Sequence, residues 1–236
     1  MAEPVLFLPG LLCDDRLWRD QVAGLAGLAH GVVADLTQDD SLDAMAGRAL
    51  AAVPGRFALC GLSMGGYVAM ALMRLAPERV TRLCLMDTSA RADTPEQARR
   101  RRLLMSTSAG HRFRGVTPRL LPSLLHPDRV GDAVLGDEVA AMAERVGHDA
   151  FLRQQTAILN RSDSRAHLPA IGVPTLVAVG EGDQLTPPER AAEIAALIPG
   201  ASLERIEGAG HLPPMETPER VTAMLRAWLA GPSGGA

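Results

Sequence analysis

Short apolar runs alternate along most of the chain with segments whose apolar residues recur at helical spacing. A short uninterrupted apolar run is typical of a strand that is buried on both faces of a parallel sheet. The pattern predicts strands at Val5–Leu8, Val32–Ala34, Phe57–Leu62, Val80–Met86, Thr175–Val179 and Ser202–Ile206.

The segments between these strands have helical periodicity, and glycine or proline follows several of them. The pattern predicts helices at Arg16–Leu28, Leu42–Val53, Ser63–Leu75, Pro188–Leu197 and Pro218–Leu229. Strands that alternate with helices indicate a parallel sheet with helices on both faces and right-handed crossovers. The expected fold class is therefore α/β, with a mostly parallel central sheet of about six strands.

The strand pattern stops at about Ala90 and resumes after His167. The intervening stretch is helical in character, with prolines as punctuation, and long excursions from a compact core are usually functional or disordered. We therefore expect an α/β core of residues 1–89 and 168–236. Residues 90–167 are expected to form a helical lid that is inserted between the fourth and fifth strands.

Composition and charge narrow the function classes. The 236 residues are 47% hydrophobic, which is enough for one sizeable core, and the net charge of -3 gives no reason to expect a nucleic-acid partner. All 24 basic residues are arginine, which excludes a lysine Schiff base and a P-loop lysine. Cys13, Cys60 and Cys84 are odd in number and far apart, so we expect neither a disulfide framework nor a metal site.

The chain has no sequence feature that indicates a membrane. No apolar run approaches the roughly 20 residues that span a bilayer, and the N-terminus lacks the pattern of a signal peptide. We therefore expect a cytoplasmic protein, and the sequence leaves its oligomeric state open.

A serine between glycines is the strongest chemical signal. Gly61-Leu62-Ser63-Met64-Gly65 joins the third strand to a helix. A sharp strand-to-helix turn exposes a serine as a nucleophile, and glycines on both sides relieve the crowding. Ser63 is therefore the predicted nucleophile, and the amide of Met64, at the helix N-terminus, is placed to bind an oxyanion.

The last two strands each lead into a glycine-rich loop that carries a candidate partner for the serine. Asp183 follows the fifth strand, and His211 follows the sixth in Gly208-Ala209-Gly210-His211. A histidine base takes the serine proton, and an acid orients the imidazole and stabilises its charged form. The order serine, aspartate, histidine predicts a catalytic triad of Ser63, Asp183 and His211. Glu181 competes locally with Asp183, which could instead cap the following helix.

The loop after the first strand supplies the other half of the predicted oxyanion hole. Leu8-Pro9-Gly10-Leu11-Leu12 directly follows that strand, so the amide of Leu11 can point into the site beside that of Met64. The alternative is an ordinary Pro-Gly turn at the end of a strand.

Together these motifs resemble the α/β-hydrolase superfamily, in particular its small bacterial esterase and enol-lactonase-like branch. The resemblance rests on PGLLCDDRLW, LCGLSMGGYVAMAL, TLVAVGEGDQLTPPE and GAGHLPPMETPERV, and it covers nearly the whole chain. It implies an α/β-hydrolase fold that lacks the first hairpin of the family, and a helical cap. Some members place the acid at the position of Asp87, but the loop of Asp183 matches the family better.

The inserted segment bears on the substrate. Residues 91–129 hold nine arginines and three acids, an excess that could steer an anionic or carrier-bound substrate or could simply be solvated. The scarcity of aromatic residues, 3% of the chain, favours an aliphatic pocket for short to medium acyl chains. The candidate lining residues, which could instead only pack the lid onto the core, are Leu103, Leu104, Met105, Leu120, Leu121, Leu124 and Leu125.

The predicted function is hydrolysis of small carboxylic esters through an acyl-enzyme on Ser63, without a cofactor. The same triad would also serve a lactonase, a C–C hydrolase or a cofactor-free perhydrolase. A non-catalytic binding module ranks last, because all three triad residues are present.

Overall fold

The computed structural model describes residues 3–108, 113 and 115–231. These residues form one parallel sheet of six strands in the order β2-β1-β3-β4-β5-β6. The predicted parallel sheet is thereby confirmed. Its strands are β1 (Glu3–Leu8), β2 (Ala29–Val33), β3 (Phe57–Leu62), β4 (Val80–Met86), β5 (Thr175–Gly180) and β6 (Ser202–Ile206).

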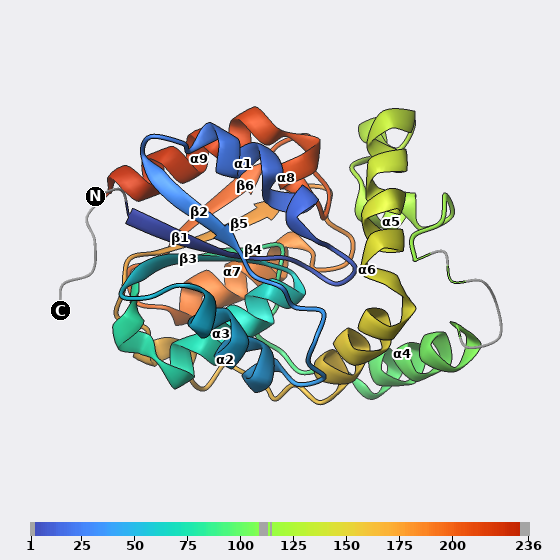
Figure 1. Ribbon diagram of the computed structural model, residues 1–236, viewed down its shortest axis with the longest axis horizontal. Coiled ribbons are helices and arrows are strands. Elements are labelled where there is room, and N and C mark those ends of the chain that lie inside the picture. The colour runs from blue at the N-terminus through green and yellow to red at the C-terminus, as the bar shows by residue number, and fades with distance from the viewer. Residues whose placement is uncertain (1–2, 109–112, 114, 232–236) are drawn as a thin grey trace.

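Helices cover both faces of the sheet (Figure 1). Helices α1, α8 and α9 lie on one face, and α2, α3 and α7 lie on the other. The helices are α1 (Arg19–Gly24), α2 (Leu42–Ala52), α3 (Met64–Leu75), α4 (Pro95–Ser108), α5 (Leu121–Leu124), α6 (Ala133–Leu159), α7 (Pro188–Leu197), α8 (Pro213–Glu216) and α9 (Pro218–Ala230). Short 3-10 turns lie at Asp15–Trp18, Pro77–Arg79, Pro127–Arg129 and Leu168–Ala170.

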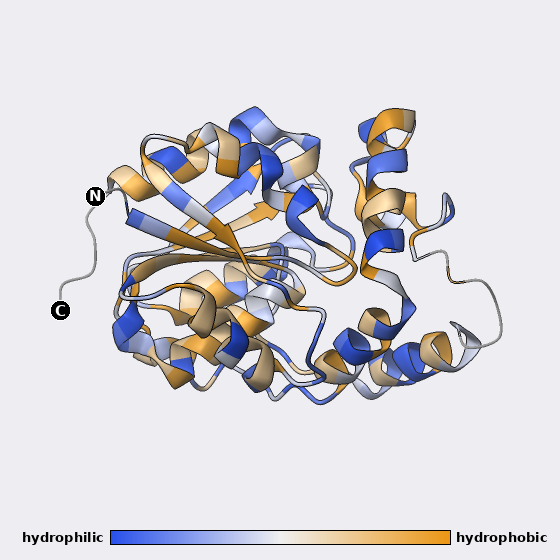
Figure 2. Cartoon of the chain, in the orientation of Figure 1, coloured by the Kyte–Doolittle hydropathy of each residue, from blue (hydrophilic) through white to orange (hydrophobic). Residues whose placement is uncertain are grey.

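Alternating side chains of each strand fill two separate apolar cores. In β1, Leu6 and Leu8 belong to the core under α2 and α3, whereas Val5 and Phe7 belong to the core on the opposite face. All four are fully buried. A strand buried on both faces must be apolar at every position, and this requirement produces the uninterrupted apolar runs of the sequence. The central strands are accordingly hydrophobic along their length (Figure 2).

The predicted helix at Arg16–Leu28 is wrong in its extent. A 3-10 turn occupies Asp15–Trp18, and α1 already ends at Gly24. Glycine is a poor helix former, and Gly27 has a positive φ of 87° that turns the chain toward the sheet. Strand β2 therefore starts at Ala29, three residues before the predicted start at Val32.

The helical insertion, residues 90–167, contains α4, α5 and α6 and lies between β4 and β5 in the chain, as predicted. It stands beside the carboxyl ends of the strands (Figure 1). Helix α6 is kinked at Gly147, where φ is 79°. Its function as a separate lid on a core of residues 1–89 and 168–236 stays a prediction. Among the described helices, none combines the length and apolarity that a bilayer crossing requires.

Candidate active site

Ser63 occupies a strained turn between β3 and α3. Its φ of 55° and ψ of -115° are unfavourable for a residue with a Cβ atom, and such strain costs about 1–3 kcal/mol. Two hydrogen bonds from neighbouring segments hold the turn. The amide of Ser63 donates to the carbonyl of Met86 at 3.0 Å, and the Thr88 hydroxyl donates to the carbonyl of Ser63 at 2.8 Å.

Two glycines of the turn are required by close backbone contacts. A Cβ atom on Gly65 would lie 2.0 Å from the carbonyl oxygen of Leu8, and one on Gly61 would lie 2.4 Å from the carbonyl oxygen of Gly65. Any side chain there would force the first helical turn of α3 away from β1. The glycines of the sequence motif therefore set the position of Ser63 relative to the sheet.

The loop after β6 brings His211 to Ser63. Its Nε2 atom lies 2.9 Å from Ser63 Oγ, and its Nδ1 atom lies 2.8 Å from Asp183 Oδ2. The His211 side chain is buried, at 6% exposure. The structure thus brings together all three side chains of the predicted triad, in the connectivity that the sequence order indicates.

Asp183 is held as an ionised carboxylate by four hydrogen-bond contacts. Its Oδ1 accepts the amides of Leu185 and Thr186 at 2.8 and 3.1 Å. Its Oδ2 accepts the Thr186 hydroxyl at 2.6 Å and faces His211 Nδ1. Burial alone would raise the pKa of Asp183, but the charge of His211 and these hydrogen bonds bring it well below its ordinary value. The competitor Glu181 is exposed on the same loop.

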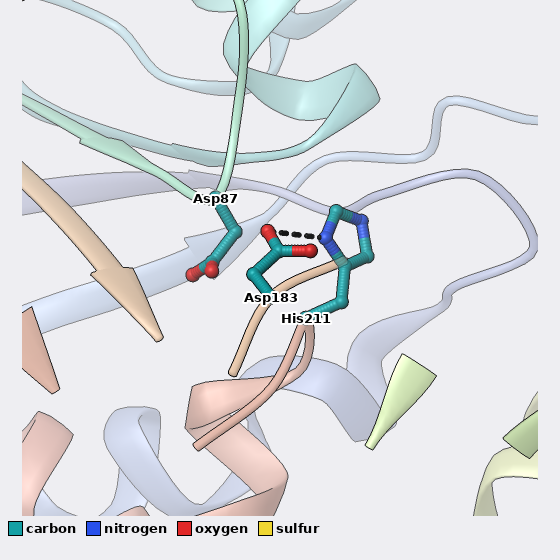
Figure 3. Close-up of side chains that lie close together, drawn as sticks. All are labelled: Asp87, Asp183 and His211. Atoms are coloured by element: carbon teal, nitrogen blue, oxygen red, sulfur yellow. Dashed lines mark hydrogen bonds and ion pairs between the residues drawn. The ribbon is translucent and has the colours of Figure 1, made fainter. Parts of the chain in front are cut away.

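Asp87 ends β4 directly beside this pair (Figure 3). It has a positive φ of 44°, it is fully buried, and its Oδ1 accepts the amide of Gly180 at 2.9 Å. Its Oδ2 has no hydrogen-bond partner within the described part of the chain. Burial, and then the negative charge of Asp183, raise the pKa of Asp87 well above its ordinary value. Asp87 thus has a raised pKa and no contact with the imidazole that any hydrogen bond records, whereas Asp183, whose pKa is lowered, directly contacts the imidazole.

Asp87, Asp183 and His211 also form the one close group of metal-ligating side chains in the described residues, with their ligand atoms within 4.8 Å of one another. The donor set does not suit a cation. All four lone-pair positions of the Asp183 carboxylate already accept hydrogen bonds or face His211 Nδ1, and burial raises the pKa of Asp87, which disfavours the ionised form that a cation requires. The chemistry of the group is that of an oriented base.

The loop after β1 carries the other predicted oxyanion donor, Leu11. The amide of Leu11 and the amide of Met64, the first residue of α3, donate no hydrogen bond to the described residues outside that helix. Leu12, the next residue, has a φ of 59°, and its amide donates to Gln154 Oε1 of α6 at 3.0 Å. The loop conformation is therefore fixed by a fully buried side chain of the helical insertion.

Sequence reasoning missed three supporting side chains. Gln154 holds the loop after β1, Thr186 bonds Asp183, and Glu216 bonds the loop of His211. Thr186 lies three residues after Asp183, so a threonine at this spacing in Thr186-Pro187-Pro188 could have indicated a hydrogen bond to the acid. Gln154 contacts a residue 142 positions away, and no local pattern indicates such a contact.

The candidate pocket residues differ in their surroundings. Leu103, Leu104 and Leu120 are 63%, 49% and 46% exposed, so they do not line an enclosed pocket. Helix α4 has no buried residue, because it projects from the body of the molecule. By contrast, Leu125 is buried in the core that includes Leu212, next to the predicted base.

Of the other histidines, His30 and His167 are exposed, and His126 and His148 are half-buried. His111 lies outside the described residues. The arginines of α4 differ in their surroundings. Arg101 is paired with Asp93, whereas Arg99, Arg100 and Arg102 are exposed.

Comparison with known proteins places this arrangement in a known group. A sequence model described as the alpha/beta hydrolase family matches residues 5–224. A protein of Nitrosomonas europaea named pimeloyl-[acyl-carrier protein] methyl ester esterase is 30% identical over 204 residues, covering 84% of this chain and 81% of its own length.

Two solved structures have nearly the same architecture. A thermophilic esterase from Thermogutta terrifontis superposes with a TM-score of 0.88 at 32% identity, covering 97% of this chain and 90% of its own. The enol-lactonase from Burkholderia xenovorans superposes with a TM-score of 0.87 at 23% identity, covering 98% of this chain and 92% of its own. The second likeness concerns the fold alone.

Proposed function

Because the chain belongs to the alpha/beta hydrolase family, we propose that it is a serine esterase that cleaves small carboxylic esters through an acyl-enzyme on Ser63. One observation carries the proposal. His211 Nε2 lies 2.9 Å from Ser63 Oγ while its Nδ1 lies 2.8 Å from Asp183 Oδ2, which is the arrangement of an activated serine nucleophile.

The proposed reaction begins when Ser63 Oγ attacks the ester carbonyl and His211 Nε2 takes the serine proton. Asp183 keeps the Nδ1 proton in place and stabilises the imidazolium. The carbonyl oxygen becomes an oxyanion, which the amides of Leu11 and Met64 bind. Collapse of this intermediate expels the alcohol, which takes the proton from His211. Water, deprotonated by His211, then attacks the acyl-enzyme and releases the acid.

The proposal includes an anionic or carrier-bound substrate with a short to medium acyl chain. Its support is the exposed face of α4, where Arg99, Arg100 and Arg102 face solvent beside the exposed Leu103 and Leu104. Such a surface fits an acidic partner through long-range attraction. The Nitrosomonas relative is named for an acyl-carrier-protein ester, which agrees with this expectation.

The first test is hydrolysis of p-nitrophenyl esters from acetate to decanoate by the wild type and by Ser63→Ala. We expect a wild-type rate that is lost in Ser63→Ala, with an optimum at short to medium chains. Retention of the rate in Ser63→Ala would refute the nucleophile. An inactive wild type would refute the esterase assignment and direct the assay to lactones.

The substrate's charge is tested separately with Arg100→Glu, compared with Arg205→Glu on the edge strand β6, which is also exposed. We expect Arg100→Glu alone to raise the KM for a methyl ester bound to an acidic carrier protein, and to leave p-nitrophenyl acetate hydrolysis unchanged. Equal effects of the two variants on the carrier-bound ester would refute a role for α4.

A further inference from the structure

Glu216 is a buried carboxylate at the end of α8, and three backbone amides converge on it. Its Oε1 accepts the amides of Gly210 and Leu212, at 2.9 and 3.0 Å. Its Oε2 accepts the amide of His126, at 2.6 Å. The residue is 1% exposed. An ionised carboxylate is costly to bury, so its presence here requires these amides or an equivalent partner.

The first two amides flank His211 on either side. One carboxylate oxygen thus holds the backbone immediately before and immediately after the predicted base. The orientation of the imidazole depends on that backbone, because Nε2 must stay within hydrogen-bond distance of Ser63 while Nδ1 faces Asp183. A shift of about 1 Å at such a position can cost about 100-fold in rate.

The third amide belongs to a different part of the chain, the bridging segment, which we define as residues 124–129 of the helical insertion. A second contact joins the same two parts, since the amide of His211 donates to the carbonyl of Leu124 at 2.8 Å. Arg129 Nη1 in turn donates to the carbonyl of Glu216 at 2.9 Å. The loop after β6, residues 207–212, which we call the base loop, is therefore connected to the bridging segment at His211 itself and through Glu216.

Helix capping accounts for only part of this pattern. Leu212 is the N-cap residue of the four-residue helix α8, so its bond to Glu216 is a cap, whereas Gly210 and His126 lie outside that helix. Within the described residues, no arginine or histidine side chain is paired with its carboxylate. Burial raises the pKa of Glu216, and the three amides oppose this effect. The carboxylate is thus held by the very backbone that it orients.

We propose that Glu216 is a positioning residue for His211 that joins the loop of the base to the bridging segment of the helical insertion. The inference rests on the proposed serine chemistry. In the resulting arrangement, the base is at its working distance from Ser63 when the bridging segment is docked, and the insertion contributes to the geometry of the triad as well as to the surroundings of the substrate.

The test measures how fast a fluorophosphonate labels Ser63, together with kcat and KM for p-nitrophenyl butyrate. Labelling reports the nucleophile and base without dependence on the natural substrate. Glu216→Gln keeps an oxygen for Gly210 and Leu212 but presents an NH₂ group to the donor of His126. We expect about tenfold slower labelling for Glu216→Gln and about 100-fold for Glu216→Ala, with kcat reduced and KM unchanged. The control is Glu219→Gln, whose side chain is exposed on α9.

A second pair of variants removes the connection from the other side and guards against misfolding of the Glu216 variants. His126 has a φ of -56° and follows a residue in extended conformation, so a proline fits its backbone and removes the amide proton together with the imidazole. His126→Ala keeps the amide and removes the ring. We expect His126→Pro to label about tenfold more slowly than His126→Ala at a temperature where circular dichroism shows both variants to be folded.

The outcomes separate the two proposals. Failure of the fluorophosphonate to label the wild type would refute the serine esterase. A labelled wild type whose folded Glu216→Gln matches Glu219→Gln, or whose His126→Pro matches His126→Ala, would refute the positioning role alone. An increase in KM with unchanged kcat would also overturn it, because that result assigns the residue to substrate binding.

Discussion

Gln154 offers a sharp test of how the helical insertion supports the loop after β1, residues 9–14. We call it the oxyanion loop because it carries the proposed oxyanion donor Leu11. The side chain is fully buried in α6, and its two ends bond backbone groups of two different loops. Its Oε1 accepts the amide of Leu12 at 3.0 Å, and its Nε2 donates to the carbonyl of Leu36 at 3.2 Å. Gln154→Met keeps the length of the side chain and removes both bonds. It also leaves a buried donor and a buried acceptor without partners.

The expected magnitude follows from these two contacts. An unsatisfied buried polar group costs about 1–3 kcal/mol, so the loss of both partners should lower the free energy of unfolding by about 2–6 kcal/mol. Leu12 also has a strained φ of 59°, which persists because the amide is bonded. If the loop relaxes with a preference of about 2 kcal/mol, the conformer that presents the Leu11 amide is depleted about 30-fold. We expect kcat/KM to fall by about that factor.

The assay combines urea unfolding with p-nitrophenyl butyrate kinetics at a temperature where both variants are fully folded. The control is Gln155→Met, the neighbouring buried glutamine, whose Oε1 accepts Arg101 Nη1 at 2.8 Å and which bonds no residue of the oxyanion loop. It should lose stability while folded protein keeps its kcat. Equal kcat/KM for folded Gln154→Met and Gln155→Met would show that the insertion does not support the oxyanion loop.

Two further predictions concern stability. Asp87 has a raised pKa when folded, so the wild type loses stability as pH rises above the unfolded value of about 3.9, by up to about 1.4 kcal/mol per pH unit. The side chain of Asp87→Asn does not titrate, so the free energy of unfolding of this variant in urea should increase relative to that of the wild type as the pH rises above about 4. A difference that does not change with pH contradicts this reasoning. Gly65→Ala should destabilise by about 3 kcal/mol or more in thermal melts, since its Cβ would meet the Leu8 carbonyl at 2.0 Å. The control Gly47→Ala, in an open position of α2, should stabilise by about 0.5–1 kcal/mol, and a Gly65→Ala melt that matches it would contradict the packing argument.

The central strands could be predicted because burial on both faces constrains every residue. Phe57–Leu62 and Val80–Met86 were predicted with their observed bounds, and both are buried almost throughout. The edge strand β2 was predicted less well, since Ala29-His30-Gly31 carries little apolar signal. Its start is determined by pairing with β1, where Glu3 faces Ala29, and sequence periodicity does not report such a partner.

The positions of Ser63, Asp183 and His211 were also predictable, because parallel strands end at one edge of the sheet. The choice between Asp183 and Asp87 is a different matter. Both residues end strands near His211, and sequence spacing alone does not separate them. The surroundings do so physically, since Asp183 receives the amides of Leu185 and Thr186, whereas the second oxygen of Asp87 has no partner among the described residues.

Two of the three side chains that sequence reasoning missed connect the helical insertion to loops of the sheet. Gln154 reaches the loop after β1, and Glu216 receives His126 while it holds the loop after β6. The first loop carries the proposed oxyanion donor, and the second carries the proposed base. An insertion that merely covered the site would need only apolar packing against the core. A buried polar group that loses its partner carries an uncompensated desolvation cost. These contacts to both loops therefore favour one docked arrangement over many loosely packed ones. The insertion is therefore better understood as a component that helps to define the geometry of the site than as a detachable cover.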